Sequence, residues 1–329
     1  MEIKGILVSV LAPFDNHMAN GGEKLLGNAS SIKRRPDGRV YVSGQMQRHV
    51  LFSAIDRLNQ ADENRGETFV SNGDGISNQI ENDLRADMGG FMHPSKGDYS
   101  GRRTAPVSVT PAVAMKQSEV GRDLLVRLKM DGSNNSSDQA LATREFSQHD
   151  IMHMNFFLDV TALSVSKVFK YESGFNIASN YIKHAKDAER LRRARLFLEA
   201  TKSMNDYANQ ARNAVSGEPQ EVLIVFDTVL SRKASRYFVA DENERANILQ
   251  ELNDRKAKYF IGDDKGDKDH SVHKAYQDAL TFLLNSENSL NNPAGGDDEV
   301  KTFAKAFGVS ANVESVNQTD EQQSLNFDE

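Results

Sequence analysis

The chain has 329 residues, of which 38% are hydrophobic and 26% charged, and its formal net charge is −7 at pH 7. These values describe a soluble globular protein with enough residues for one large domain or two modest ones. It contains no cysteine, which excludes a disulfide framework, a cysteine nucleophile and a thiolate metal site, and which suits a reducing cytoplasm. No apolar run reaches the roughly 18 residues of a membrane span, so we expect no membrane insertion.

The charge is distributed unevenly along the chain. Residues 287–329 hold nine acids and only two lysines, Lys301 and Lys305, so this segment carries the whole negative excess and residues 1–286 are balanced. Within that neutral body, residues 31–50 contain five cations and one acid, Asp37. The cations are Lys33, Arg34, Arg35, Arg39 and Arg48. Local potential decides where a polyanion docks, so this basic block is a candidate binding surface.

Apolar patterning predicts the elements of the chain in order. We predict strands at residues 4–11, 39–43, 153–165 and 221–230, and a polar loop over 12–37. Helical spacing predicts helices at 45–60, 187–204, 243–255 and 270–287. The first helix begins at Ser43 or Gly44, either of which can cap it.

Residues 61–150 are polar, with glycine clusters and short apolar pieces, and they predict an irregular insertion with a hairpin that turns near 131–138. The remaining order is β–α–insertion–β–α–β. This order is typical of a ferredoxin-like α+β fold, an antiparallel sheet with helices on one face.

Enzyme motifs are weak in this sequence. NGDGISN (72–78) lacks the last glycine of a dinucleotide loop, and neither a P-loop lysine nor a GxSxG elbow occurs. His149 and His153 lie four residues apart, but in a predicted strand entry that spacing does not converge on a metal. DDKGDKDH (263–270) has the acid density of a calcium loop without a glutamate at the twelfth position, so a solvated loop that caps the next helix explains it better.

The basic block has the chemistry of a phosphate-binding surface. Its cations lie at a strand–helix junction, where backbone N–H groups also favour an anion. Polar side chains suited to phosphate oxygens are interleaved with them, namely Asn28, Ser30, Ser31, Ser43 and Gln45. Tyr41 is the only aromatic residue, whereas a base-stacking platform uses several. The block is therefore suited to hold a sugar-phosphate backbone and leave bases free, as a guide strand requires. The alternative is that this block has no ligand and is an ordinary solvated, charged loop before a helix.

The stretch GNASSIKRRPDGRVYVSGQMQRHV resembles the signature of the DevR-type CRISPR-associated proteins, the backbone subunit of Cascade-like type I interference complexes in the RAMP superfamily. The family's pattern corresponds here to Gly27–Arg34, Asp37–Arg39, and then Val42, Ser43, Gln45 and Arg48. Downstream, NDLRADMGGFM, RRTAPVSVTPAVAM, FFLDVTALSV, RLRRARLFLEA and ARNAVSGEP follow in the family's order. The resemblance covers roughly residues 1–230.

The resemblance implies a modified RRM-like palm formed by residues 1–60 and 151–230, with a thumb-like loop at about 205–219 and a fingers-like insertion at 61–150. Residues 231–286 would form a C-terminal helical part, and 287–329 an acidic, mobile tail. It also implies a cytoplasmic, non-enzymatic protein without cofactors, several copies of which bind one CRISPR RNA side by side in a helical filament. Its partners would be the CRISPR RNA, target DNA through guide pairing, neighbouring copies and other Cascade subunits.

Guide contacts are implied residue by residue. By position they include Lys33, Ser43, Gln45 and Arg48, with Asn28, Ser31, Arg34, Arg35 and Arg39 from the same block. Arg102, Arg103 and Arg212 are further candidates, for which surface solubility or subunit contact is an equal alternative.

Asn28 separates this chain from related backbone subunits that cleave RNA. Those subunits carry an aspartate at this position, and an amide neither holds Mg²⁺ by charge nor serves as a general base. Asn28 therefore favours a non-cleaving, DNA-targeting subunit. Two alternatives remain, a metal-dependent subunit that cleaves target RNA and a monomeric RRM-like RNA-binding protein. For the acidic tail we consider two roles, screening of the basic groove before RNA arrives and docking on another subunit.

Overall fold

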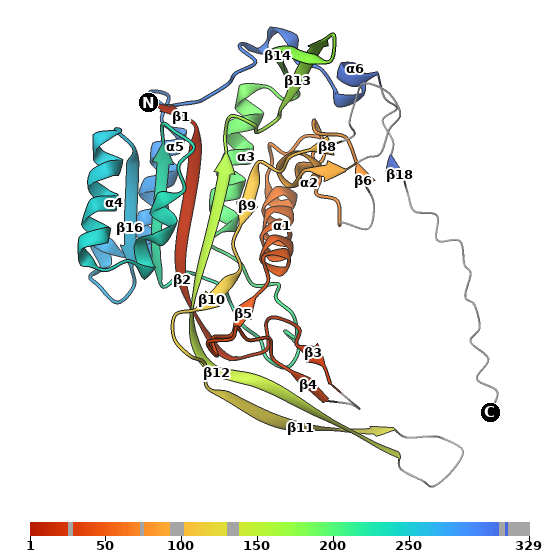
Figure 1. Cartoon of the computed structure of the whole chain (residues 1–329), viewed down its shortest axis with the longest axis vertical. Coiled ribbons are helices and arrows are strands. Elements are labelled where there is room, and N and C mark those ends of the chain that lie inside the picture. Colours follow the sequence, from red (N-terminus) through yellow and green to blue (C-terminus); the bar gives the residue numbers. More distant parts are fainter. Residues whose placement is uncertain (26–28, 73–75, 93–101, 130–137, 309–312, 315–329) are drawn as a thin grey trace, which may run out of the picture.

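A computed structural model describes the chain except for residues 26–28, 73–75, 93–101, 130–137, 309–312 and 315–329 (Figure 1). Its centre is a ten-stranded sheet with the path β16–β15–β2–β12–β10–β5. These strands are Lys258–Asp263, Glu221–Asp227, Gly5–His17, Asp138–Asp159, Ala112–Ala114 and Tyr41–Val42, and neighbours on this path pair antiparallel. Outside the path, β11 (Val120–Lys129), β9 (Val107–Val109) and β4 (Ala29–Ser31) pair with β12, and β3 (Glu23–Lys24) pairs with β4.

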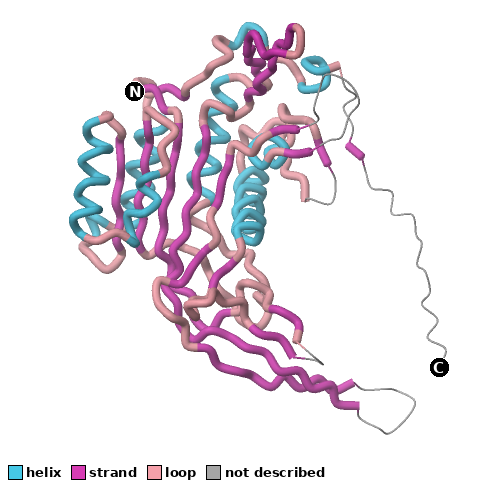
Figure 2. The backbone as a smooth tube through the Cα atoms, in the orientation of Figure 1, coloured by secondary structure: helices cyan, strands magenta, loops and turns pink. Residues whose placement is uncertain are grey.

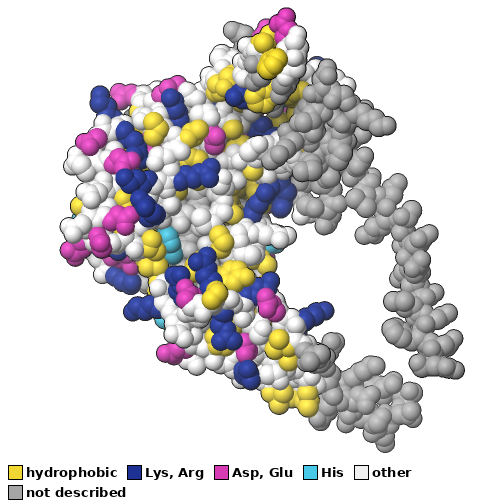
Figure 3. Space-filling model, in the orientation of Figure 1, with side chains coloured by type: hydrophobic (Ala, Val, Ile, Leu, Met, Phe, Trp, Pro, Cys, Tyr) yellow, Lys and Arg dark blue, Asp and Glu magenta, His cyan; other side chains and the backbone are white. Residues whose placement is uncertain are grey.

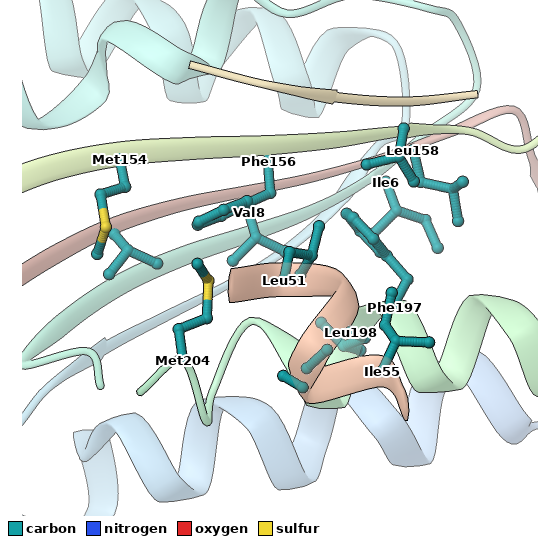
Figure 4. Close-up of a cluster of buried hydrophobic side chains, with 14 of the residues drawn as sticks. Ile6, Val8, Leu51, Ile55, Met154, Phe156, Leu158, Phe197, Leu198 and Met204 are labelled. Atoms are coloured by element: carbon teal, nitrogen blue, oxygen red, sulfur yellow. The ribbon is translucent and has the colours of Figure 1, made fainter. Parts of the chain in front are cut away.

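Helices cover both faces of this sheet. Alternation along β2 directs Ile6, Val8 and Val10 to one face, where they join a core with α1 (Gly44–Ala61), α3 (Asp187–Ala200) and α5 (Val272–Leu284) (Figure 4). Leu7 and Leu11 point to the other face, where η1 (Lys233–Val239) and α4 (Glu242–Asp254) cover them. The expectation of helices on one face is therefore wrong, because β2 and β15 are apolar on both faces and need cover on both.

Two predicted regions gain strands. The insertion contributes β9 and β10 to the central sheet, together with the short elements α2 (Leu84–Gly89), β6 (Ile76–Ser77), β7 (Phe91–Met92) and β8 (Arg102–Arg103). The C-terminal helical part contains, besides α4, α5 and the short η2 (Lys268–His270), the edge strand β16.

Two hairpins extend from the body (Figure 2). The first is the arm formed by β11 and the first half of β12, and the second joins β13 (Val165–Glu172) to β14 (Phe175–Lys183). The strand predicted at 153–165 thus begins earlier and ends at Asp159, and residues 160–164 form the turn that leads into β13. In Figure 1 the arm and the β13–β14 hairpin lie at opposite ends of the molecule.

Residues 289–308, which we call the C-terminal strap, follow the surface of the body. β17 (Ser289–Leu290) pairs in parallel with β1 (Glu2–Ile3), and η3 (Asp297–Glu299) and α6 (Phe303–Phe307) come next, before β18 (Val313–Glu314) pairs with β6. Phe303 is buried, and the Nδ1 of His184 lies 2.7 Å from the carbonyl oxygen of Lys301. The strap belongs to the acidic segment that we expect to be mobile unless it docks. It is docked, since an apolar side chain and backbone hydrogen bonds hold it.

Candidate nucleic-acid interface

The basic block is a strand and a tight turn that lie beside the base of the arm, rather than an open loop (Figure 1). β4 pairs with β12, and a tight turn then brings Arg34 opposite Val40 before β5 begins. Arg35 and Arg39 are joined by a backbone hydrogen bond of 2.9 Å, and Gly38 takes the positive φ of 80° that this turn requires. The cations between residues 33 and 39 are thereby gathered on one turn.

This turn leads directly into the N-terminus of α1. Ser43 is the N-cap, and its hydroxyl accepts a hydrogen bond of 3.2 Å from the backbone N–H of Met46. No acid occupies the first turn of this 18-residue helix, and Gln45 is exposed there. The positive end of the helix dipole therefore faces the same region as the cations. Ser43 has a capping role in addition to the guide contact expected of it.

The cations of the turn differ in how they are engaged. Arg34 lies 3.4 Å from Glu145, and Arg39 lies 2.7 Å from Asp37. The backbone N–H of Arg39 and its guanidinium hold the pKa of Asp37 below its usual value. Among the described residues, no side-chain hydrogen bond or ion pair engages Lys33 or Arg35, so both are available to a phosphate.

Glu145 organises the edge of this surface. Its buried carboxylate accepts hydrogen bonds from the backbone N–H of Ile32, from Arg34 and from Arg122, which reaches it across the β11–β12 pair at 3.1 Å. Next to it, Arg144 donates a hydrogen bond of 2.7 Å to the hydroxyl of Ser30. Sequence reasoning missed Arg122 and Arg144. Alternation along the arm strands puts Arg122 on the face of its partner Glu145, but Arg144 on the opposite face, and the bond of Arg144 to Ser30 depends on the pairing of β12 with β4, which no local pattern signals.

Arg48 lies further along α1 and joins it to α2. Its guanidinium donates to the carbonyl oxygen of Gly89 and lies 5.7 Å from the ring centroid of Phe52. Burial lowers the pKa of Arg48. A Cβ on residue 89 would lie 2.6 Å from the Nη2 of Arg48, so the glycine leaves the space that the guanidinium occupies.

Arg103 has a different role from the guide contact predicted for it. Its side chain is 6% exposed, and it donates to the Asp87 carboxylate at 2.5 Å and to the carbonyl oxygens of Ala162 and Val165. These bonds commit the guanidinium to the interior, so we correct Arg103 from a guide contact to a structural residue. For Arg102 only the backbone, in β8, is described.

Arg212 lies on the loop that we predicted to be thumb-like, and that loop packs on the body. Asn209 and Asn213 donate hydrogen bonds of 3.0 and 2.8 Å to the carbonyl oxygens of Met18 and Asn16. The exposed Arg212 lines a cavity of about 320 Å³ between this loop and the arm. The cavity is also lined by Met18, Asp123, Leu125, Arg144, Glu145, Phe146, Asn209 and Asn213. The cavity reaches Glu145, which also bonds to Arg34, but its lining includes none of residues 31–39.

Two other predicted residues complete the comparison with the sequence. Ser31 is half-buried in β4, next to the turn. Asn28 lies outside the described residues, so its position relative to the cations stays a prediction.

The candidate metal motifs have ordinary structural roles. His149 pairs with Asp15 at the surface, whereas His153 is turned toward the Oγ of Ser9 at 3.2 Å, so the two rings have separate partners. In the 263–270 segment, Asp264 accepts a hydrogen bond of 2.9 Å from the backbone N–H of Val272 at the start of α5. Within the residues that the structure describes, no group of three or more histidine or acidic side chains is placed to hold a metal ion.

Comparison with known proteins decides the family. Residues 17–216 match the model of the family described as "CRISPR-associated negative auto-regulator DevR/Csa2". The chain belongs to the DevR/Csa2 family. No curated protein sequence matches it. The matched range contains the basic turn, the start of α1 and the loop of Arg212.

Solved structures share the fold of this DevR/Csa2 chain at low sequence identity. A chain of a "CRISPR RNA-guided surveillance complex" is 15% identical with a TM-score of 0.50, over 85% of this chain and 100% of the other. A chain of a "CRISPR RNA-guided surveillance complex, pre-nicking" is 12% identical with a TM-score of 0.49, over the same shares. The first likeness supports a mixed α+β architecture of this type. No helix among the described residues is long and apolar enough to span a membrane.

Proposed function

We propose that this DevR/Csa2 protein is a non-enzymatic, multicopy subunit that holds the backbone of a CRISPR RNA and leaves its bases free to pair with target DNA. The observation that carries the proposal is the convergence of Lys33 and Arg35, both without side-chain partners among the described residues, with the positive end of α1. Such a surface binds phosphates without reading bases.

The surroundings of this surface support a backbone contact. Glu145 holds Arg34 and Arg122 beside the turn, and Arg48 extends the line of cations along α1 toward α2. Tyr41 is half-buried in β5 and offers no broad stacking platform. A phosphate-directed surface suits a guide whose bases are displayed, because pairing then carries the sequence specificity.

In this mechanism, charge neutralisation supplies affinity, and repetition of the subunit along one RNA supplies cooperativity. A head-to-tail contact between identical copies forms an open helical filament. If each copy neutralises three or four phosphates of a single strand, the salt slope is about −2 to −3 per protomer. Other subunits of a Cascade-like complex would bind the ends of such a filament.

The test is whether the purified protein carries RNA of one discrete size. We expect such RNA in the wild type and its loss in Lys33→Glu/Arg35→Glu. The matched control is Lys256→Glu/Lys268→Glu, which reverses two exposed cations remote from the turn in sequence. The control should keep the RNA.

Three outcomes would contradict the proposal. Failure of added guide RNA to bind at low salt would remove the basic turn as a guide surface. Strong binding of short RNA by a protein that stays monomeric would favour the monomeric RNA-binding alternative. Mg²⁺-dependent cleavage of target RNA at regular spacing would favour the ribonuclease alternative.

A further inference from the structure

The β13–β14 hairpin exposes aromatic and apolar side chains that the guide surface does not use. Phe175 is 74% exposed, Ile177 50%, Phe169 47% and Tyr181 40%. Figure 3 shows hydrophobic side chains gathered on this hairpin, at the opposite end of the molecule from the arm. Large apolar groups exposed together mark a binding surface.

The register of the hairpin defines one of its faces. Lys167 pairs with Tyr181, and Phe169 pairs with Ser179, so these four side chains share a face. A register shift follows between Lys170 and Tyr171, and Ile177 and Phe175 lie beyond it toward the turn. The turn residues Ser173 and Gly174 both have positive φ, as a two-residue hairpin turn requires.

The base of the hairpin is fixed to the body, so its outer part projects from the surface and is accessible to a ligand. Val165 and Ser166 are buried, and His184 lies 2.9 Å from the Oγ of Ser166. Lys183 bonds to Asp187 at 2.8 Å and to Asp297 in the C-terminal strap. Arg190 also pairs with Asp187, at 3.1 Å.

The charge on the exposed face favours a nucleic acid over a protein. The Nζ of Lys167 lies 5.1 Å from the ring centroid of Phe169, in the middle of the aromatic face. Lysine is depleted in protein–protein interfaces, whereas single-strand binding sites combine aromatic rings with cations beside them. Glu172 is the one acid between residues 165 and 183.

We propose that this face, formed by Lys167, Phe169, Ser179 and Tyr181, binds the unpaired bases of single-stranded DNA; Phe175 pairs with Glu172 and lies on the opposite face. The choice of DNA rests on the proposed function, since pairing of a guide with duplex DNA leaves one strand without a partner. Bases stack on the rings without sequence preference, and Lys167 contacts a phosphate. The hairpin is thus a second nucleic-acid site, separate from the basic turn and different in chemistry.

The experiment measures fluorescence anisotropy of labelled 30-nucleotide oligothymidylate with the full chain. All variants carry Lys33→Glu/Arg35→Glu as well, so that binding of the oligonucleotide to the basic turn does not contribute to the anisotropy. In that background we expect Phe169→Ala/Tyr181→Ala to weaken binding about 30-fold or more, because loss of stacking on each of the two rings weakens binding about 5- to 150-fold. Lys167→Gln should reduce the salt slope by about 0.7.

A second variant separates stacking from apolar contact. Phe169→Leu/Tyr181→Leu keeps apolar area but removes the rings, so it should lose DNA as the alanine variant does. Val239→Ala is the control, since it shortens an apolar side chain that is 55% exposed outside the hairpin. It should leave binding unchanged. Oligouridylate of the same length distinguishes RNA from DNA, and binding that is equally tight or tighter would overturn the assignment to DNA.

The other outcomes also decide the proposal. Unchanged oligothymidylate binding in the hairpin variants would overturn it, as would absence of binding in the Lys33→Glu/Arg35→Glu background. A changed oligomeric state by light scattering with unchanged DNA binding would identify a protein interface instead. Failure of the proposed function looks different, because it would appear as absence of guide RNA in the wild type and not as an effect of hairpin variants.

Discussion

Asp87 provides the sharpest test of the interior of this protein. Its carboxylate is fully buried and accepts hydrogen bonds from Arg103 at 2.5 Å, from Arg193 at 2.7 Å, and from the hydroxyl and backbone N–H of Ser164 at 2.7 and 2.9 Å. Burial opposes its ionisation, but the two guanidinium charges outweigh burial and lower the pKa of Asp87. The group is therefore charged at neutral pH.

Asp87→Asn keeps the shape of the side chain and removes its charge. Two guanidinium groups, 0% and 6% exposed, would then lose the fully buried carboxylate that they share, although Arg193 keeps its pair with Glu189 at 2.7 Å. Removing one partner of a buried ion pair costs about 3–5 kcal/mol, so we expect the free energy of unfolding to fall by that amount. The same cluster fixes α2, whose Gly89 carbonyl oxygen accepts from Arg48. Guide affinity should therefore fall together with stability.

Urea unfolding at pH 7, followed by far-ultraviolet circular dichroism, measures this loss in a chain without tryptophan. The control is Asp278→Asn, which removes an exposed i,i+4 pair with Lys274 on α5 and should cost only about 0.3–0.5 kcal/mol. A loss at Asp87→Asn no larger than that of the control would refute the buried cluster. It would also reopen Arg103 as a candidate RNA contact.

Four further predictions follow from particular contacts. Burial lowers the pKa of His153 and of His184 to about 4, so unfolding exposes groups that bind protons below about pH 6.5. The contribution of each histidine to the free energy of unfolding is complete above pH 6.5 and is lost as the pH falls toward 4, by up to about 3 kcal/mol. His184→Gln should therefore make the free energy of unfolding depend less on pH, as measured by urea unfolding at several pH values. Gly89→Ala should displace Arg48 and weaken guide binding in a filter-binding assay. Gly66→Ala, where a Cβ meets no atom within 4 Å but φ is +55°, should lower stability and leave guide binding unchanged. Ser43→Ala should lower the free energy of unfolding by about 1 kcal/mol and guide affinity with it, while loss of affinity at unchanged stability would mean that the hydroxyl does not cap α1. Truncation after Glu314 removes four acids and should leave the melting temperature unchanged, whereas truncation after Leu290 removes the buried Phe303 and should lower it markedly.

Sequence patterns predicted the central elements because burial is encoded locally in them. The continuous apolar runs at 4–11 and 221–230 are β2 and β15 at the centre of the sheet, and the helical spacing at 45–60, 187–204 and 270–287 corresponds to α1, α3 and α5. The polar segment 12–37 was less predictable. β2 continues to His17, and the short β3 and β4 depend on pairing with a distant strand.

The β13–β14 hairpin escaped prediction for a different reason. None of the described side chains in its outer half is buried, so its pattern does not separate apolar from polar residues, as Lys167, Phe169, Asn180 and Tyr181 illustrate. The tight turn at Ser173–Gly174 was the available signal, since a small residue before glycine between two aromatic-rich runs is typical of a hairpin. A strand pattern without a buried face lacks the periodicity on which such predictions depend.

Arginines were the hardest residues to assign from sequence, because one residue type serves two purposes here. On α3, Arg190 and Arg193 are fully buried, and their donors are taken by carbonyl oxygens and Asp87. Arg103 is buried in the same region, although it follows Arg102 in a run that reads as a basic patch. The hydrogen-bond partners of each guanidinium in the folded structure, and not the sequence, distinguish these buried arginines from Arg35.

This separation explains how an acidic chain can bind a polyanion. The arginines of the interior are neutralised by Asp87, Glu189, Asp62 and backbone carbonyl groups, so they add little to the field outside. On the basic turn, Asp37 pairs with Arg39 and lies near Arg35, and Glu145 restrains Arg34 and Arg122 without reaching Lys33 or Arg35. Net charge is therefore a poor guide to function in this protein. The useful quantity is the charge left over after internal pairing, and among the predicted guide contacts Lys33, Arg35 and Arg212 retain it, since no side-chain hydrogen bond or ion pair engages them within the described residues.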